Sequence, residues 1–286
     1  MRILTLFARN GTEKYRDVDA RIRRQLQEDL AGVDREFVIV DTAMGPDVME
    51  VRGDGVVILG ASNDHWEFGA WGRGVEYCRH RLMEFDYIHF VTSAFYFGYV
   101  DFHRFVSQEM LELYRGRAVA LGHIEVYNEP VAFRSIRFQS WLRSSYMFIP
   151  PAEVVMLGDL TTVKGGEGVF SGDPTVPFVS GGDVSPSYAH NLTSWLTGEG
   201  TGQGVEWHSR FVLDVASLPF FKAKAKAIIN EMSLSNRLKA QGCALVDMTW
   251  LHRKIAGGSV PSDVPSWHTQ LVERGTGHES IVEGAR

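Results

Sequence analysis

The chain has 286 residues, a length typical of one large or two small domains. Its residues are 44% hydrophobic and 22% charged, a composition typical of a globular protein. Its net charge of −6 argues against a protein that binds nucleic acid through the phosphate backbone, because such proteins carry a basic surface. Cys78 and Cys243 are far apart and lack metal-binding spacing, so we expect both to pack as small apolar residues in a reducing compartment.

The N-terminal sequence MRILTLFARN is too polar for a secretory signal peptide, because its apolar run ends at Arg9 and Asn10. No run of about 18 uninterrupted apolar residues is present, so no transmembrane segment is expected. We therefore expect a cytoplasmic protein. If its substrate is linked to a lipid, the protein would dock peripherally at the inner face of the membrane.

Apolar runs alternate with helical patterns through the first 121 residues. The predicted strands are 3–8, 36–40, 55–60, 86–92 and 118–121. The predicted helices are 15–30, 66–82 and 101–114. Solid apolar strands separated by helices predict an α/β fold with a mostly parallel sheet and helices on both faces.

The pattern is less regular in the rest of the chain. Further helices are predicted at 152–160, 188–196 and 220–241. Residues 138–149 are rich in aromatic side chains, and neither a helix nor a strand is predicted for them. The Gly- and Pro-rich segment 164–186 is predicted to be a long loop.

The segments that follow the predicted parallel strands are the candidate site. Ligands of open parallel sheets bind beyond the carboxyl ends of the strands, so residues 7–12, 41–42, 60–67 and 92–96 are expected to converge. The stretch 60–74, GASNDHWEFGAWGRG, fits two interpretations. It is either a ligand loop or a capped helix with buried tryptophans.

Four short motifs resemble those of the rhamnan-synthesis-type glycosyltransferases and related polysaccharide glycosyltransferases of GT-A fold. In those proteins an Asn precedes a Gly-Ala-Trp helix, and here Asn63 precedes 66–71, WEFGAW. Their next strand ends in Asn-Asp-Ser or Asp-x-Asp, where this chain reads FVTSAF at 90–95. The segments RFQSWL at 137–142 and EMSLS at 231–235 resemble their His-x-Gln-Ser-Tyr-Phe and Glu-x-x-Leu-Ser motifs. The likeness spans roughly residues 1–250.

This resemblance implies one GT-A-like domain over residues 1–256. The nucleotide-binding half would span about 1–125 and the acceptor half about 126–256, followed by a loosely ordered tail at 257–286. It implies transfer of a sugar from a nucleotide-sugar donor to a hydroxyl of a surface polysaccharide or related glycan, including a lipid-linked glycan acceptor. The oligomeric state stays open.

The resemblance also implies site residues. Those for substrate or nucleotide binding are Phe7, Arg9, Asn10, Asp41, Asn63, Glu67, Trp71, Thr92, Ser93 and Gln139. A turn-forming role fits Asp41 equally well. A base that takes the proton of the acceptor hydroxyl would be Asp101, His123 or Glu231, each of which also fits a structural role.

The metal element of these enzymes is not matched. An Asp-x-Asp element holds Mn²⁺ or Mg²⁺ on the donor diphosphate, and the matching residues here are Thr92, Ser93 and Ala94. One alternative is a metal held by other carboxylates, namely Asp64, Glu67 or Asp101. A second is a metal-free site in which helix N-terminal amides or arginines contact the diphosphate, namely Arg9, Arg73 or Arg143. A third is a lost donor site.

The alternative functions follow from the same residues. A non-catalytic relative of the same fold would bind a nucleotide or glycan, with its pocket filled by aromatic residues such as Phe95 or Tyr96. An unrelated α/β hydrolase or transferase is the third interpretation. An active transferase predicts an open pocket at the strand ends.

Overall fold

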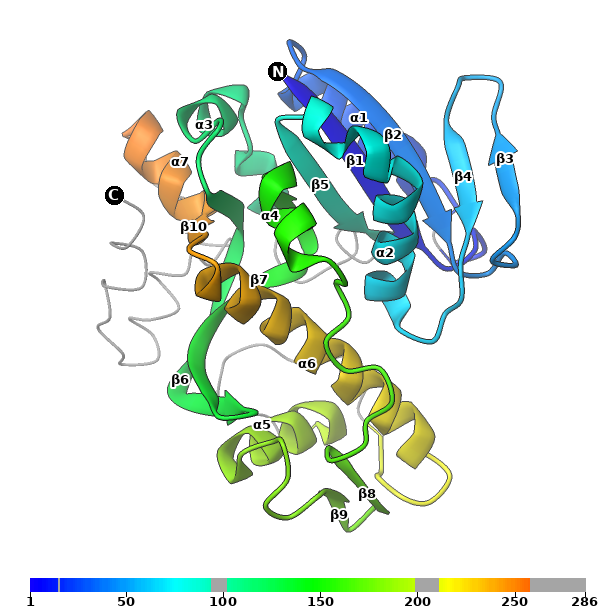
Figure 1. The fold of residues 1–286 in the computed structure, drawn as a ribbon, viewed down its shortest axis with the longest axis vertical. Coiled ribbons are helices and arrows are strands. Elements are labelled where there is room, and N and C mark those ends of the chain that lie inside the picture. The colour runs from blue at the N-terminus through cyan, green and yellow to red at the C-terminus, as the bar shows by residue number, and fades with distance from the viewer. Residues whose placement is uncertain (15, 94–101, 199–210, 258–286) are drawn as a thin grey trace.

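The computed structural model describes residues 1–14, 16–93, 102–198 and 211–257 (Figure 1). The strands are β1 (Arg2–Arg9), β2 (Asp34–Asp41), β3 (Met49–Val51), β4 (Val57–Gly60), β5 (Tyr87–Thr92), β6 (Val119–Phe133), β7 (Ile136–Ile149), β8 (Phe170–Asp173), β9 (Val176–Phe178) and β10 (Ala244–Asp247). The α-helices are α1 (Val18–Asp29), α2 (Trp66–Cys78), α3 (Gln108–Leu113), α4 (Pro151–Leu157), α5 (Pro186–Thr197), α6 (Leu218–Ala240) and α7 (Met248–Ala256). Two 3₁₀ helices, η1 (Arg79–Glu84) and η3 (Phe102–Phe105), complete the described elements.

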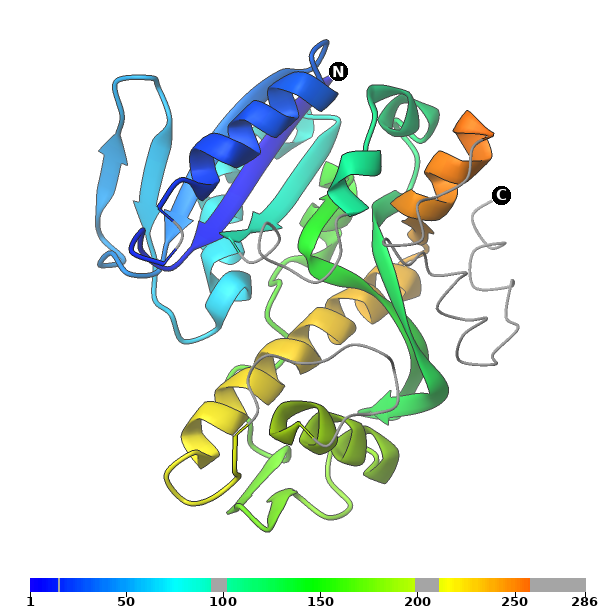
Figure 2. The same ribbon diagram turned by 180° about the vertical axis from the view of Figure 1, so that it is seen from behind.

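The main sheet has the order β10-β6-β7-β5-β1-β2-β4-β3 among the described strands. Its first half is parallel, as predicted: β1 pairs with β2 and β5, and β2 pairs with β4. Side chains of β1 alternate between the two faces, so that Leu4 and Leu6 join a core under α2, and Ile3 and Phe7 join a core under α1. The two helices therefore cover opposite faces of this half (Figures 1 and 2).

The second half of the sheet is built on a long antiparallel pair. Strands β6 and β7 are joined by Arg134 and Ser135, whose φ angles of 48° and 66° suit a two-residue hairpin turn. β7 also pairs antiparallel with β5, and β10 pairs parallel with β6. The sheet is therefore mixed overall, although its parallel pairs are in the majority. The β6–β7 pair extends beyond the parallel half toward α5 and the β8–β9 hairpin (Figure 1).

Helix α6 connects the two halves. Near its C-terminal end Leu234 and Leu238 belong to the core under α2. Nearer its N-terminal end Phe221 and Ile229 belong to an outer core, which they share with α5 and the far ends of β6 and β7. The helix crosses the front of the molecule diagonally (Figure 1). One wall of the space between the halves is therefore a single rigid element.

Several predicted elements differ from the observed ones. The strand predicted at 118–121 is only the start of β6, whose later residues include the polar Asn128, Glu129 and Pro130. The helix predicted at 101–114 is divided into η3 and α3, because the Ser107 side chain accepts a hydrogen bond from the Met110 amide and starts a new helix there. The loop predicted at 164–186 contains β8 and β9, and β3, β7, β10 and α7 were not predicted.

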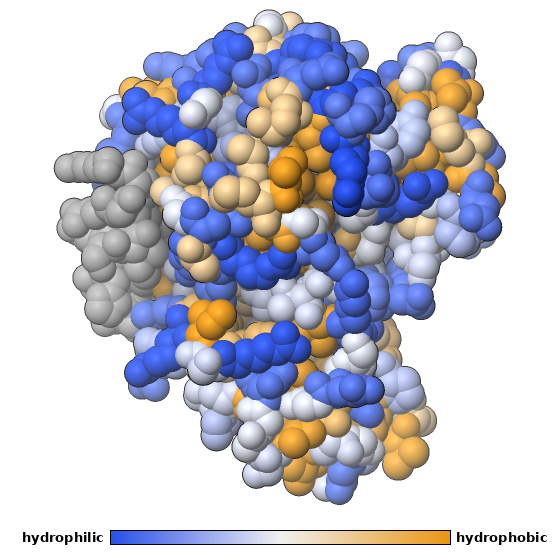
Figure 3. All heavy atoms as spheres, viewed as in Figure 1, coloured by the Kyte–Doolittle hydropathy of each residue, from blue (hydrophilic) through white to orange (hydrophobic). Residues whose placement is uncertain are grey.

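The surface and the cysteines complete the description. Cys78 and Cys243 are buried and unbridged, so both pack in the core as predicted. Hydrophilic side chains cover most of the face seen in Figure 3, with apolar ones gathered over α4, where Val155 and Met156 are more than half exposed. Within the ranges that the structure describes, none of the helices has the length and apolar character needed to cross a membrane.

Candidate functional site

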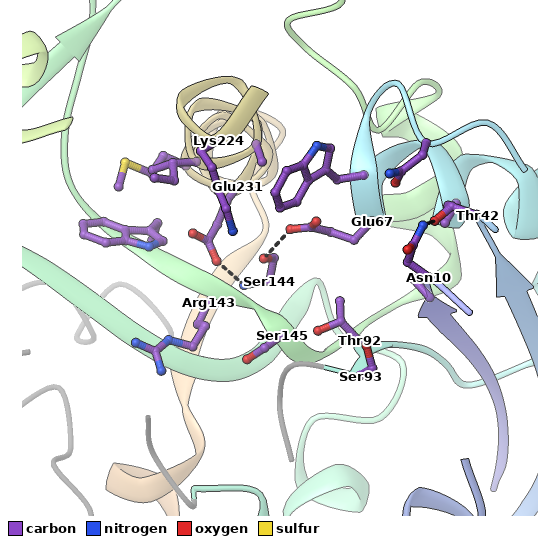
Figure 4. A pocket seen from close by; sticks show the side chains of 18 of the residues that line it. Asn10, Thr42, Glu67, Thr92, Ser93, Arg143, Ser144, Ser145, Lys224 and Glu231 are labelled. Atoms are coloured by element: carbon purple, nitrogen blue, oxygen red, sulfur yellow. Dashed lines mark hydrogen bonds between the residues drawn. The ribbon is translucent and has the colours of Figure 1, made fainter. Parts of the chain in front are cut away.

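A cavity of about 540 Å³ opens at the carboxyl ends of the parallel strands, between the sheet and α6. Seven of the residues predicted for the site line it: Arg9, Asn10, Asn63, Glu67, Thr92, Ser93 and Glu231. They come from segments up to 222 residues apart in sequence, since Arg9 is the last residue of β1 and Glu231 lies on α6. Figure 4 shows this convergence on the ends of the strands.

The strand-end wall of the cavity is organised by Asp41. One carboxylate oxygen of this buried residue lies 2.7 Å from Nε of Arg9, and the other accepts hydrogen bonds from the Gly11 and Ala43 amides at 2.8 and 3.0 Å. Asp41 itself does not line the cavity, which agrees with the turn-forming interpretation. It holds Arg9 and the loop after β1 in place.

A second contact fixes the polar edge of this wall. The Asn10 side-chain amide donates a hydrogen bond to Oγ1 of Thr42 at 2.8 Å (Figure 4). Thr92 and Ser93 lie below them at the end of β5, with hydroxyl groups that can donate to or accept from a ligand. The wall therefore presents neutral hydrogen-bonding groups and one neutralised arginine.

The start of α2 forms the next part of the cavity. Trp66 has a φ of 53°, a conformation that costs energy for a residue other than glycine, and its side chain lines the cavity. The ammonium of Lys224, on α6, lies 4.3 Å from the centre of the indole ring. An indole and a lysine from different elements are thus held together at the cavity wall.

The opposite wall carries carboxylates linked through Ser144. An oxygen of Glu231 accepts a hydrogen bond from the Ser144 amide, and the Ser144 hydroxyl donates to Glu67 at 3.2 Å (Figure 4). Arg143, the preceding residue, forms an ion pair with Glu125, so its charge is also neutralised.

The electrostatics of this wall raise carboxyl pKa values. Burial, with the nearby charge of Glu125 acting in the same direction, raises the pKa of Glu231 to about 7 against the opposing effects of Ser144 and Arg143. Burial also raises the pKa of Glu67. Burial lowers the pKa of Lys224, with the charge of Lys14 acting in the same direction and Glu67 in the opposite one. Glu231 is therefore poised to exchange a proton near neutral pH.

Two aromatic residues that were predicted to bind the nucleotide belong to the core instead. The Phe7 ring packs 6.1 Å from that of Phe37, and Trp71 donates its indole N–H to the Leu6 carbonyl at 3.1 Å. Both are at most 1% exposed. Strand alternation turns Phe7 toward α1, and the buried face of α2 takes Trp71, so the expectation that they contact a ligand is corrected.

Gln139 and His123 do not line the cavity. Gln139 donates to the carbonyls of Tyr127 and Asn128 and so stabilises an irregularity in the β6–β7 pairing. His123 is fully buried with Nδ1 3.4 Å from an Asp247 carboxylate oxygen. Neither is placed to contact a ligand. Asp101, with Ala94, Phe95 and Tyr96, lies outside the residues that the structure describes.

The described residues do not fit a divalent cation. In the part of the chain that the structure describes, no group of three or more His, Cys, Asp or Glu side chains is arranged to hold one. At the Asp-x-Asp position the cavity is lined by the hydroxyls of Thr92 and Ser93, which are weak ligands for Mg²⁺ or Mn²⁺. Glu67 lies nearby, but its carboxylate already accepts a hydrogen bond from the Ser144 hydroxyl and interacts with the positive charge of Lys224.

Sequence reasoning did not identify several residues that line the cavity. These include Lys14, Tyr127, Ser144 and Lys224. No motif marks them. Lys224 sits in an alternating KAKAK stretch whose spacing alone does not show which lysine faces inward.

No family model matches the sequence, and no curated protein matches it. The likeness to glycosyltransferases thus stands on the four motifs alone. The site is defined by its geometry.

Proposed function

We propose that the protein is a glycosyltransferase that moves a sugar from a nucleotide-sugar donor to a hydroxyl group of a glycan. The observation that carries the proposal is the position of Glu231, whose carboxylate lines the cavity beside Ser144, on the side away from Asn10 and Thr42. Its pKa of about 7 suits a general base. The parallel half with its strand-end cavity and the second half built on β6, β7 and α6 support a GT-A-like fold in which one half binds the donor and the other the acceptor.

The proposed reaction needs one base and one leaving group. The acceptor hydroxyl oxygen bonds to the anomeric carbon of the donor sugar while the bond from that carbon to the diphosphate oxygen breaks. The electron pair of the broken bond stays on the diphosphate, and the hydroxyl proton passes to Glu231. Asn10, Thr42 and the hydroxyls of Thr92 and Ser93 would orient the donor by hydrogen bonds.

The acceptor end of the cavity is aromatic. Tyr127 and Trp141, whose ring centres are 4.7 Å apart, lie there with Trp195 and Leu192. Flat apolar rings of this kind pack against the C–H face of a sugar ring. They support a glycan acceptor, free or carried on a lipid.

A nucleotide-binding screen tests the proposal. Thermal unfolding is followed with UDP, GDP, dTDP and CDP, each with and without Mn²⁺ or Mg²⁺. A ligand that binds only the folded state adds about 2.7 kcal/mol at a hundredfold excess over its Kd, so one nucleotide is expected to raise the melting temperature. If none of the nucleotides raises the melting temperature, the protein does not bind a nucleotide-sugar donor and the proposal is wrong.

A non-catalytic relative of the same fold is the second candidate. It is favoured by one observation, the hydroxyls of Thr92 and Ser93 where carboxylates would hold a metal. Turnover of a nucleotide sugar distinguishes the two candidate functions. A transferase releases free nucleotide from the nucleotide sugar in the presence of acceptor and loses this activity in Glu231→Gln, whereas a non-catalytic relative binds without releasing nucleotide.

A further inference from the structure

A second cavity lies at the opposite end of the main sheet from the first. It has a volume of about 470 Å³ and is lined by the amino-terminal part of β2, the last turn of α1 and the turn between β3 and β4. Figure 2 shows α1 lying across this face of the sheet, with the β3–β4 hairpin beside it. The two cavities share no lining residue, so the second one is a separate candidate site.

The second cavity exists because β4 is shorter than β2. β2 begins at Asp34, and all of its residues pair with β1 along one edge. Along the other edge β4 pairs with it only from Val38 onward, where Val57 is the partner. The residues of β2 before Val38 therefore have no neighbouring strand on this side among the described elements.

Two backbone amides of β2 point toward this unpaired edge. The amide of Asp34 donates a hydrogen bond to the Met1 carbonyl at 3.0 Å, so it points toward β1. Successive residues of a strand direct their backbone groups to opposite edges, so the amides of Arg35 and Phe37 point away from β1. Both residues line the second cavity. Their N–H groups can therefore donate hydrogen bonds to a ligand bound there.

The charged side chains of the second cavity are paired, with one exception. Each of the carboxylates in its lining contacts an arginine. The pairs are Arg23 with Asp54 at 2.6 Å, Arg81 with Glu36, and Arg2 of β1 with Asp34 at 3.1 Å. The exception is Arg35, which forms no ion pair with any residue that the structure describes.

Arg35 is a partly buried cation without a counter-ion. Its Nη1 atom is shielded from solvent and has no hydrogen-bond partner among the described residues. Burial lowers the pKa of Arg35, although a guanidinium keeps its charge at neutral pH. A desolvated charge raises the free energy of the protein unless an opposite charge lies beside it. An anion bound in the second cavity would supply that opposite charge.

A carboxylate matches this environment better than a phosphate does. A guanidinium binds both oxygens of a carboxylate through two parallel N–H groups. The unbalanced charge of the lining is a single positive one, whereas a phosphate dianion would bring a second negative charge close to the carboxylates of the lining. Leu26, Val33 and Val56 also line the cavity, and they suit an apolar group attached to the carboxylate.

From this geometry we propose that the second cavity binds a carboxylate through the guanidinium of Arg35 and the amide of Phe37. The apolar part of the ligand packs against Leu26, Val33 and Val56. The carboxylate belongs to a small free acid or to the C-terminus of a peptide, since both present the same two oxygens. The site is independent of the proposed transferase reaction, because it shares no residue with the first cavity.

Nuclear magnetic resonance titration of the isotope-labelled full chain with butyrate tests the proposal. The amide signals of Arg35 and Phe37 are expected to shift as butyrate binds. Arg35→Gln is expected to weaken binding about tenfold or more, as loss of a charge-assisted contact does. The matched control is Arg24→Gln, which removes the same charge from an exposed residue of α1 outside the cavity lining. It is expected to bind within about twofold of the wild type.

Two results of this titration would overturn the proposal. One is equal affinity of Arg35→Gln and Arg24→Gln for butyrate. The other is a set of shifted signals confined to the first cavity. Inorganic phosphate that binds more tightly than butyrate would contradict the choice of a carboxylate.

Arg35→Lys separates charge from geometry and replaces Arg35→Gln if that variant does not fold. Lysine keeps the positive charge but lacks the planar pair of N–H groups, so an affinity between those of the wild type and Arg35→Gln is expected. Wild-type affinity in Arg35→Lys would contradict binding through two parallel hydrogen bonds.

The source of the carboxylate is tested with acetyl-alanyl-alanyl-valine and its C-terminal amide. If the peptide acid binds more tightly than butyrate and the amide does not bind, the ligand is a peptide C-terminus. If butyrate binds at least as tightly as the peptide acid, the ligand is a small free acid. Failure of both acids to bind would overturn the site, whatever the nucleotide screen shows, so the two proposals fail separately.

Discussion

The two walls of the first cavity are held in different ways. At the strand-end wall, the buried carboxylate of Asp41 accepts hydrogen bonds from the Gly11 and Ala43 amides and pairs with the guanidinium of Arg9. At the wall formed by α6 and β7, the carboxylate of Glu231 also accepts a backbone amide, that of Ser144, but the Ser144 hydroxyl links it to a second carboxylate, Glu67, rather than to an arginine. The first arrangement gives a rigid frame, and the second places groups that change charge near neutral pH. Damage to the first is therefore expected to affect folding more than damage to the second.

The largest effect is expected from Asp41→Ala. The change leaves Arg9, whose side chain is only 12% exposed, without its carboxylate, and it removes the acceptor of two backbone amides. Removing one partner of such a buried pair costs about 3–5 kcal/mol of unfolding free energy, measurable by urea denaturation. Asp41→Asn keeps an oxygen for the amides and should lose less. A loss below about 1 kcal/mol for Asp41→Ala would show that the wall does not depend on this residue.

Gly60→Ala tests the same wall through packing. An added Cβ at the end of β4 would lie 1.8 Å from the Gly45 carbonyl oxygen, which belongs to the loop after β2. Because a backbone atom must move, we expect a loss of about 1–3 kcal/mol or more, together with weaker ligand binding. Thermal unfolding checks the prediction, and a variant as stable as the wild type would contradict it.

Glu231→Gln tests the wall formed by α6 and β7, through the pKa of its buried carboxyl group. The pKa of Glu231 rises from 4.5 to about 7 on folding, so the native state holds a proton that the unfolded state has released. The wild type should therefore lose stability relative to Glu231→Gln as the pH rises from 4.5 to 7, by up to about 3 kcal/mol. Denaturation of both proteins at several pH values measures the difference, and parallel pH profiles would contradict the raised pKa.

The smallest effect, and the only stabilising one, is expected from Gly72→Ala. Gly72 lies inside α2 with open space where a Cβ would be, and it does not line the cavity. Alanine should raise the unfolding free energy by up to about 1 kcal/mol, because glycine is the weaker helix former. A destabilised Gly72→Ala would mean that the space beside it is not open. The variant also serves as the control for Gly60→Ala.

The sequence predicts the parallel half well and the second half poorly. Strands β1, β2, β4 and β5 are short and buried on both faces, so each reads as a solid apolar run, and their ends give Arg9, Asn10 and Thr92 as site residues. Strand β6 continues through Asn128, Glu129 and Pro130, where no apolar pattern marks a strand. Its pairing with β7 is a tertiary contact that local sequence does not encode.

The same limit applies to the site. Glu231 was found through a motif, whereas Ser144 and Lys224 have roles only because β7 and α6 face each other across the cavity. Phe7 and Trp71 were misplaced for the opposite reason. Their neighbours in sequence line the cavity, but strand and helix periodicity turn these two side chains into the core.

Helix α6 contributes residues to both the core under α2 and the outer core, and this has a consequence for folding during synthesis. The core under α2 includes Leu234 and Leu238 from α6, and the sheet is completed by β10, which ends at Asp247. When the parallel half has emerged from the ribosome, the core under α2 is therefore still incomplete, because the residues of α6 that pack in it have not yet been synthesised. We expect this half to stay open to chaperones until the last described helices emerge, so that stop codons placed before residue 218 yield chains that are degraded rather than a small folded domain.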